Sequence, residues 1–452
     1  MEKLAINQLP KRVVEIFNEI KQTDFQVYLV GGAVRDLILG RELKDLDFTT
    51  DAKPEEILKI FPNGHYNNKF GTVSVPSDSG VIEITTMRRE EDYTDFRHPA
   101  KIVWTNKIEE DLKRRDFTIN AIALEVGSNE NIILIDPFHG QTDLENKLIR
   151  AVENPDIRFH EDALRLIRAI RFATELHFSI EENTFESVKN DAPKITNISW
   201  ERIRDELFNI LASDDPADGM ILLKNSGLLK FILPELDKTF GIVQEGPKHV
   251  RIYDIGEHSF NSLKFCSSSD PIVRFATLIH DVGKVDTFKV QEDGNVTFYG
   301  HDVVGGKIAL KICQRLRLSK KDTDRVVKLV RFHLFTVDEK QTDSAIRRFI
   351  KNVGLENLDD MFALREADRL GGGTEKPTSW RLEKFKERIK EVLHKPFSIT
   401  DLKVNGEDVM ETLNIPPGRK VGEVLESLLQ EVQEDQSKNN REYLLERIKQ
   451  LY

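Results

Sequence analysis

The chain has few cysteines and no long apolar segment, and both absences limit the classes of protein to which it can belong. Only two of its 452 residues are cysteine, Cys266 and Cys313, and they lie far apart. No stretch approaches the roughly 20 apolar residues that a membrane helix needs, and residues 1–11 lack a charged-then-apolar signal pattern. We therefore expect a cytoplasmic protein without disulfides that does not enter a membrane.

An excess of positive charge is also absent. The formal net charge is -11, which argues against indiscriminate binding to nucleic acid, so an RNA partner would have to contact a local basic surface. Hydrophobic residues make up 39% and charged residues 32% of the chain, as in ordinary globular proteins. The length exceeds the roughly 250–300 residues over which one core keeps growing, so several domains are expected.

The pattern of elements changes along the chain. Strand-like segments such as "FQVYLV", "GTVSVP" and "GVIEITT" alternate up to about Glu125. From Arg158 onward, apolar residues recur at spacings of three and four, which predicts helices. The fold class is therefore α+β: we expect a mixed-sheet head over residues 1–150, then a helical neck over 151–250, a helical body over 251–375 and a helical tail over 376–452.

The segment "YLVGGAVRDLILGRELKDLDFTT" combines a glycine pair with a carboxylate pair. Val27–Val30 should form a strand, Gly31 and Gly32 a turn, and the following residues a helix whose first N–H groups remain unpaired. Glycines let a phosphate approach that backbone, and Arg35 lies one turn further on, where a guanidinium can bind phosphate oxygens. A simple tight turn would also explain the glycines.

Asp45 and Asp47 are two residues apart, so on a strand they face the same side. Two ionised carboxylates repel unless a cation joins them, and oxygen ligands favour Mg²⁺ shared with substrate phosphates. Glu83, on another predicted strand, is a candidate third carboxylate. A solvated pair at a sheet edge is the alternative.

This segment resembles the signature of class II tRNA nucleotidyltransferases, the CCA-adding enzymes, and of the related bacterial poly(A) polymerases. The segments "RRDFTINAIAL", "DPFHGQTDLENKLIRAV", "FHEDALRLIRAIRFA" and "ISWERIRDEL" follow in the family's order, and the tail is similar as well. The resemblance implies a polymerase-beta-like head and template-independent addition of C, C and A to the tRNA 3' end. It implies CTP and ATP as substrates. It also implies that Asp45 and Asp47 are the catalytic residues and bind Mg²⁺.

The resemblance also assigns nucleotide contacts within "RRDFTINA". It implies that Arg115, Asp116 and Asn120 contact the ribose and the nucleotide. These polar residues lie in an otherwise apolar run that reads as a strand followed by a helix, and buried charges require partners. A local ion pair between Arg115 and Asp116 would be an alternative explanation.

The segment "EDALR" carries the predicted base selection. On a continuous helix Glu161, Asp162 and Arg165 share one face. Cytosine and adenine both offer an amine beside an unprotonated ring nitrogen, so a carboxylate acceptor next to an arginine donor pairs with either. The resemblance implies that these three residues form the protein template and that Arg168 and Arg171 help to hold the nucleotide. An intrahelical ion pair and a basic surface stripe are the alternatives.

The segment "EEDYTDFRHPAKI" lacks apolar periodicity and reads as a loop. It is similar to the family's flexible loop through Asp95, Arg97, His98 and Pro99. In the family that loop is associated with the switch from adding C to adding A.

A second group of polar residues lies downstream of these segments, around "LIHDVGK". It resembles the metal-binding set of HD-domain phosphohydrolases, and its members here are His258, His280, Asp281, His301, His333 and Asp368. Imidazoles mixed with carboxylates suit a divalent transition metal, so a second ion (Ni, Mn, Co or Mg) is expected beside the head's Mg²⁺. The substrate would be a phosphate or cyclic phosphate on the tRNA end, unless the histidines are only structural.

Basic helical faces are the candidate tRNA-binding surfaces. They are residues 311–331, with eight basic residues among ten charged ones, and residues 380–395, with an apolar stripe of Leu382, Phe385, Ile389 and Leu393. Both would equally serve as solvated faces. The rival functions are an A-adding enzyme, a poly(A) polymerase, and an HD phosphohydrolase that uses the head only to bind RNA. Intact Asp45 and Asp47 speak against the last, and the oligomeric state stays open.

Overall fold

The computed structural model describes residues 6–43, 45–66, 70–77, 80–93, 99–127, 129–243, 254–335, 341–393 and 399–451. The chain forms two compact units: Met1–Lys238 with Arg315–Arg317, and Thr239–Gln314 with Leu318–Tyr452. The division of the sequence into head, neck, body and tail is finer than these two units and stays a prediction.

A seven-stranded mixed sheet forms the head, with the strand order β3-β4-β5-β2-β1-β8-β9. Only β2 and β5 run parallel to each other, and the other neighbours are antiparallel. The strands are β1 Val27–Val30, β2 Leu46–Thr50, β3 His65–Tyr66, β4 Thr72–Ser77, β5 Gly80–Thr86, β8 Ala123–Val126 and β9 Ile132–Ile135. A separate antiparallel hairpin pairs β6 (Arg88–Tyr93) with β7 (Pro99–Trp104).

The register of the central strands brings acidic residues together. All four residues of β1, which lies between β2 and β8 in the sheet, are buried. Helix α1 (Lys11–Lys21) covers the sheet, with Phe17 edge-on to Phe48 at 5.5 Å between ring centroids. Asp47 pairs with Val30 on one side and with Glu83 on the other. The core packing of β2 therefore fixes where Asp47 lies.

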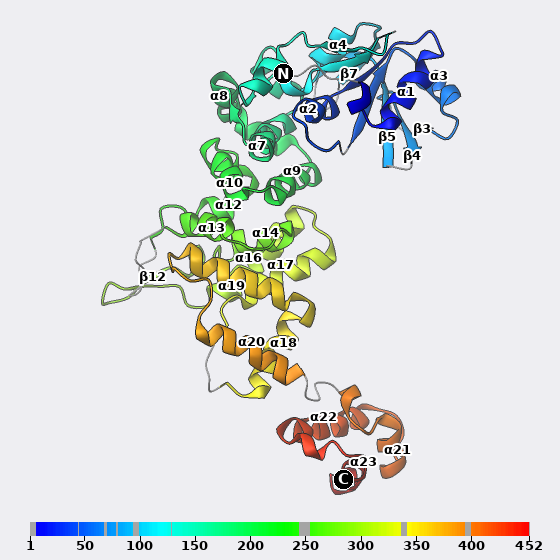
Figure 1. Cartoon of the computed structure of the whole chain (residues 1–452). Helices are drawn as coiled ribbons and strands as arrows, with labels where there is room; N and C mark the ends of the chain where they lie inside the picture. The colour runs from blue at the N-terminus through cyan, green and yellow to red at the C-terminus, as the bar shows by residue number, and fades with distance from the viewer. Residues whose placement is uncertain are drawn as a thin grey trace. The chain divides into compact units, whose positions relative to one another are not determined.

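Helices dominate the chain from residue 155 onward (Figure 1). Those of the first unit after α1 are α2 Gly32–Ile38, α3 Pro54–Ile60, α4 Ile108–Lys113, α5 Gly140–Glu145, α6 Pro155–Glu161, α7 Leu164–Leu176, α8 Glu182–Asp191, α9 Trp200–Ala212, α10 Pro216–Asn225, α11 Leu229–Ile232 and α12 Pro234–Asp237. Those that follow are α13 Ile255–Lys264, α14 Pro271–Ile279, α15 Lys284–Thr287, α16 His301–Arg315, α17 Lys320–Phe332, α18 Asp343–Val353, α19 Leu358–Gly371, α20 Trp380–Leu393, α21 Gly406–Leu413, α22 Arg419–Glu434 and α23 Arg441–Gln450. Short 3₁₀ turns cover Ile6–Gln8, Thr118–Asn120, Ala192–Asn197, Leu355–Asn357, Ile399–Asp401 and Gln436–Lys438.

The expected α+β class, a mixed sheet followed by helices, is confirmed. Two pairs of two-residue strands interrupt the helical part: β10 (Leu148–Ile149) with β11 (Ser179–Ile180), and β12 (Lys289–Val290) with β13 (Val296–Thr297). The expectation of purely helical segments there is wrong in this detail.

Three local expectations are also wrong. The helix predicted through "EDALR" breaks at Asp162, whose backbone is extended (φ -139°, ψ 105°) between α6 and α7. The segment "RRDFTINA" lies after α4 and forms a 3₁₀ turn before β8, the reverse of a strand followed by a helix. Leu393 is 36% exposed, and Val392 takes its place on the buried stripe of α20.

Two findings concern the expectations about disulfides and about membrane helices. Both cysteines are unpaired and buried. No helix in the described ranges is long and apolar enough to cross a bilayer.

Candidate functional site

The turn between β1 and α2 needs glycine for two reasons. Gly31 has a φ of +71°, a backbone conformation that side chains rarely adopt. A Cβ at that position would lie only 2.8 Å from the NH1 atom of Arg115 and 3.6 Å from the Oδ2 atom of Asp47. The bare backbone therefore allows a guanidinium and a carboxylate to meet above the turn.

Three carboxylates gather beside this turn. Asp45 directly precedes β2, Asp47 lies within it, and Glu83 is the partner of Asp47 on β5. Burial raises the pKa of Asp47, and Asp45 adds to the effect while Arg115 opposes it. Burial also raises the pKa of Glu83, with contributions from Asp47 and Asp45. The negative charges disfavour one another, which is the setting that a bound divalent cation relieves.

A chain of charge-assisted hydrogen bonds lines the other side. Arg35 donates from NH1 to the Oδ1 atom of Asn120 at 2.8 Å, and Asn120 donates from Nδ2 to Asp116 at 3.1 Å. Arg168 donates from Nε and NH2 to the Oδ2 atom of Asp116, at 2.8 and 2.7 Å. Burial raises the pKa of Asp116, but Arg168 and Asn120 outweigh it and lower the pKa well below the usual range.

The local Arg115–Asp116 ion pair considered above is not seen among the described residues. Asp116 pairs with Arg168 at 2.7 Å instead, and Arg115 approaches the fully buried Asp111 at 3.5 Å. Asp116 therefore connects the head to α7, which leaves the Arg115 side chain beside Gly31 and Asp47.

Two residues that sequence reasoning did not single out hold the arginines of α7. Glu206 on α9 forms an ion pair with Arg171 at 2.6 Å and accepts a hydrogen bond from Arg168 at 3.4 Å. The ring of Phe172 lies under three guanidinium groups, with its centroid 5.2, 5.1 and 4.1 Å from the Cζ atoms of Arg35, Arg168 and Arg171. A glutamate in the apolar stripe of α9 was the available signal for Glu206.

Most of these groups, but neither Glu83 nor Glu206, line one pocket of about 790 Å³. The predicted site residues on its wall are Gly31, Gly32, Arg35, Asp45, Asp47, Arg115, Asp116, Asn120, Arg168 and Arg171. The lining thus combines carboxylates that suit a cation with arginines that suit phosphates.

The three residues of the predicted protein template do not line this pocket. Arg165 is 8% exposed and donates to the backbone oxygens of Arg158 at 3.0 Å and Arg114 at 2.6 Å. It also pairs with Glu161 at 2.9 Å. Asp162 caps the start of α7 by accepting from the backbone N–H of Leu164 at 3.0 Å. It pairs with Arg202 of α9 at 2.8 Å.

The structure describes only part of the predicted switch loop of the head. Asp95, Arg97 and His98 of the predicted switch loop lie outside the described residues, and Pro99 begins β7. The expectation of a loop is wrong at the two described ends of this segment, which pair as β6 and β7.

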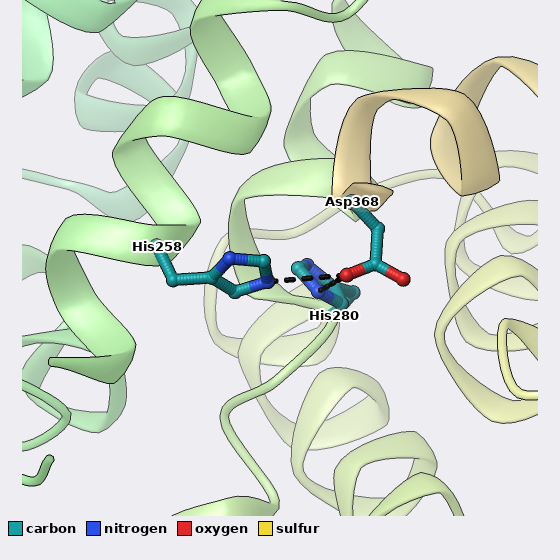
Figure 2. A group of neighbouring side chains, drawn as sticks. All are labelled: His258, His280 and Asp368. Atoms are coloured by element: carbon teal, nitrogen blue, oxygen red, sulfur yellow. Dashed lines mark ion pairs between the residues drawn. The ribbon is translucent and has the colours of Figure 1, made fainter. Parts of the chain in front are cut away.

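The six predicted HD-type residues come together in the second unit. They are supplied by α13, the end of α14, the start of α16, the end of α17 and α19. His258, His280 and Asp368 point toward one another (Figure 2), with Asp368 Oδ1 at 3.2 Å from His258 Nε2 and 3.7 Å from His280 Nε2. Asp281, His301 and His333 form the adjoining group, and the ligand atoms within each group lie within 4.8 Å of one another.

The histidine orientations are those of metal ligands. His280, His301 and His333 each place Nδ1 within 2.7–2.9 Å of a backbone oxygen three residues earlier, which leaves Nε2 to face the cluster. Burial opposes the charged form of His280, but Asp281 and Asp368 raise its pKa to about 10. Burial and the charge of His280 lower the pKa of His333 to about 4.

The two basic helical faces are partly neutralised. Within residues 311–331, Arg315 pairs with Glu235, Arg325 with Asp270 and Asp360, and Lys328 with Asp324. On α20, Lys386 pairs with Glu366 and Arg388 with Asp343. Fewer basic groups are left for RNA than the sequence suggests.

Comparison with known families gives three matches in order along the chain. Residues 27–150 match the poly(A) polymerase head domain, residues 177–240 match the RNA- and SrmB-binding site of polymerase A, and residues 303–448 match tRNA nucleotidyltransferase domain 2. The matches begin just before the glycine turn and extend into α23.

Two curated relatives align over most of the chain. The A-adding tRNA nucleotidyltransferase of Deinococcus radiodurans is 34% identical over 88% of this chain and 90% of its own length. The CCA-adding enzyme of Ligilactobacillus salivarius is 31% identical over 98% of this chain and 96% of its own length. The crystal structure of the Bacillus stearothermophilus CCA-adding enzyme in complex with CTP superposes with a TM-score of 0.71 at 28% identity. It covers 97% of this chain and 96% of that one.

Proposed function

The chain belongs to the tRNA nucleotidyltransferase and poly(A) polymerase family, and we propose that it adds C, C and A to the tRNA 3' end from CTP and ATP without a nucleic-acid template. The observation that carries this is the pocket, whose lining combines the carboxylates Asp45 and Asp47 with a network of arginines. Relatives that match along nearly the whole chain include a CCA-adding enzyme. A cytoplasmic location is part of the proposal.

Asp45 and Asp47, with Glu83 beside them, would hold the divalent ion that the family requires, which we take to be Mg²⁺. Their mutual repulsion supports the fit. When bound, Mg²⁺ supplies the positive charge that favours attack by the tRNA 3' hydroxyl and departure of pyrophosphate.

The arginine wall would position the nucleotide. Arg35, Arg168 and Arg171 are prearranged by Asn120, Asp116 and Glu206, so their guanidinium groups do not have to be ordered when a triphosphate arrives. Arg115, beside Gly31 and Asp47, lies where the reacting phosphate would approach the carboxylates.

Base selection by Asp162 and Arg165, with Glu161 as their support, remains part of the proposal. Both residues precede Arg168 on the segment that enters the pocket. To contact a base, Asp162 would exchange its bond to Arg202, and Arg165 its bonds to backbone oxygens, for bonds to the nucleotide.

One experiment separates this function from its nearest rival, since one relative is an A-adding enzyme. The protein is incubated with tRNAs ending before CCA, after C and after CC, each nucleotide is offered separately, and the products are sequenced. A CCA-adding enzyme extends all three with the right nucleotide. Extension of only the tRNA that ends in CC, with ATP, would identify an A-adding enzyme, and long A tracts would identify a poly(A) polymerase.

A second activity is favoured by the His–Asp cluster. We propose that the HD-type site binds a divalent transition metal and hydrolyses a phosphate or cyclic phosphate on the tRNA end. In that role water opens the cyclic ester to a phosphomonoester. Hydrolysis tested with Mn²⁺, Ni²⁺, Co²⁺ and Mg²⁺ checks this, and no hydrolysis with any of them would leave the cluster structural.

A further inference from the structure

The hairpin formed by β12 and β13 exposes an apolar face. Val290 pairs with Val296 across the hairpin. Phe288 and Phe298 lie two residues further from the turn, so they share the face of the valines, and their ring centroids are 5.9 Å apart. Phe288 is 42% and Val290 62% exposed, and Figure 1 shows the hairpin projecting from the helices of the second unit. Exposed apolar groups gathered on one face are typical of a binding surface.

A tyrosine and one side of α16 continue this surface. Tyr299 lies two residues after β13 and is 83% exposed. On α16, Val303, Lys307 and Leu310 follow at spacings of four and three, so they share one side of the helix, and all three are exposed. Lys311, one turn after Lys307, is exposed as well. Exposed aromatic rings beside basic groups form the kind of surface on which nucleic acids stack their bases.

Two contacts join the hairpin to the His–Asp cluster. The backbone oxygen of Phe298 lies 2.9 Å from the Nδ1 atom of His301. Lys284 places its Nζ atom 5.6 Å from the centroid of the Phe298 ring and 2.6 Å from the Oδ2 atom of Asp281. One lysine side chain thus separates an aromatic ring from the cluster, just as a ribose separates the phosphate of a nucleotide from its base.

We propose that an aromatic platform of Phe288, Val290, Phe298 and Tyr299 stacks the base of the nucleotide whose phosphate enters the His–Asp cluster. This inference rests on the proposed hydrolase function and deepens it, because it adds a site for the base. Phosphate esters that carry a base should therefore bind better than esters without one. Every base has a π face, so stacking should discriminate little among the four nucleotides.

Fluorine NMR tests the platform without relying on activity. The chain has seven tyrosines, so full-length protein is labelled with 3-fluorotyrosine, and the signal lost in Tyr299→Phe is that of Tyr299. Adenosine 2',3'-cyclic phosphate should shift this signal in a saturable way, both with EDTA and with Mg²⁺. Glycerol 1,2-cyclic phosphate has the same cyclic ester but no base, so it should leave the signal in place. Phe288→Ala should weaken binding of the adenosine compound roughly tenfold.

Kinetics with the same two esters separate the platform from the hydrolase function. With a metal ion that supports hydrolysis, Tyr299→Ala and Phe288→Ala should each raise the KM for the adenosine compound roughly tenfold and leave its kcat unchanged. Neither variant should affect hydrolysis of the glycerol compound. Phe265→Ala is the matched control, because Phe265 is also in the second unit and is 45% exposed, and it should change neither reaction. Circular dichroism checks the folding of each variant.

The outcomes for the platform and for the hydrolase function differ. A Tyr299 signal that neither ester moves, or that both move alike, overturns the platform. A shift with the adenosine compound but no hydrolysis with any metal ion leaves the platform standing and overturns the hydrolase function. Hydrolysis with the same KM in the parent and both platform variants does the reverse. A signal that moves only with protein concentration would show that a second copy of the chain covers this face, which also overturns the platform.

Discussion

At the scale of single residues, the carboxylates beside the glycine turn disfavour one another's charge. Asp47 and Glu83 both have raised pKa values because burial and neighbouring carboxylates disfavour ionisation. A carboxyl whose pKa is higher in the folded than in the unfolded state stabilises the fold when protonated, and that contribution is lost as the pH rises through the folded pKa. At neutral pH the carboxylates therefore cost stability until a cation binds.

Removing the charge of Asp47 should stabilise the protein and abolish nucleotide addition. With EDTA at pH 7, Asp47→Asn should melt about 1–3 °C above the parent, and this difference should vanish as the pH falls toward about 4. Nucleotide addition should fall by roughly 100-fold or more, while filter binding of tRNA stays largely intact. Scanning fluorimetry from pH 4 to 8 measures the first effect. The exposed Asp24→Asn is the control, and equal melting of the two variants would contradict the charge conflict.

Gly31 allows a sharper test, because Gly40 has a similar positive φ angle but no side chain of another residue close to it. Their φ angles are +71° and +66°, but a Cβ at Gly40 meets nothing within 4 Å. Gly31→Ala and Gly40→Ala should each lose about 1 kcal/mol of stability. Only Gly31→Ala should also raise the KM for CTP and ATP, by roughly tenfold, because it displaces Arg115. Similar kinetics for both variants would mean that Arg115 does not act from that position.

At the scale of elements, the sequence predicts best what neighbouring residues decide. The strand, turn and helix around Gly31 and Gly32 form as expected, because glycine and the apolar pattern act locally. The break at Asp162 was missed, because its partner Arg202 lies 40 residues further along the chain. Likewise, Glu206 holds two arginines only once α7 and α9 pack together.

The His–Asp cluster also depends on contacts between residues that are distant in the sequence. Its six members were identified through a family resemblance, since no local pattern joins residues spread from His258 to Asp368. That the two oxygens of Asp281 face different histidines could not be predicted, because it follows from how the helices that supply the cluster pack together. The two groups of donors are visible only in three dimensions.

The residues at the break between α6 and α7 are the ones predicted to choose the base. Replacing Asp162 and Arg165 together by Ala should weaken the preference for C and A, with roughly tenfold more incorporation of U and G. Because Arg165 also satisfies two buried backbone oxygens, its loss should cost about 1–3 kcal/mol of stability. Single-turnover incorporation of each nucleotide measures the preference.

Arg158→Ala is the matched control for that double variant. Arg158 is 7% exposed, pairs with Glu161 and donates to the backbone oxygen of Lys113 at 2.9 Å. It should therefore cost similar stability without changing base preference. If the double variant excluded UTP and GTP as well as the Arg158 variant does, base choice would lie elsewhere in the pocket.

At the scale of the whole molecule, the nucleotide pocket and the His–Asp cluster lie in separate compact units. The nucleotide pocket is built entirely from residues of the first unit, and the His–Asp cluster entirely from residues of the second. Neither set of ligands shares a residue with the other. The proposed metal ions should therefore be bound and lost independently, and each activity should depend on its own carboxylates.

A crossed pair of double variants tests this independence. Asp45→Ala with Asp47→Ala should abolish nucleotide addition but leave Mn²⁺-dependent hydrolysis of a 2',3'-cyclic nucleotide within a few-fold of the parent. His280→Ala with Asp281→Ala should remove that hydrolysis, because losing two adjacent ligands leaves too few donors for a divalent ion, and should leave nucleotide addition within a few-fold. Both activities are measured on each protein, with His160→Ala as control. A folded His280 and Asp281 variant that added nucleotides tenfold more slowly would show that the second unit positions the tRNA for the first.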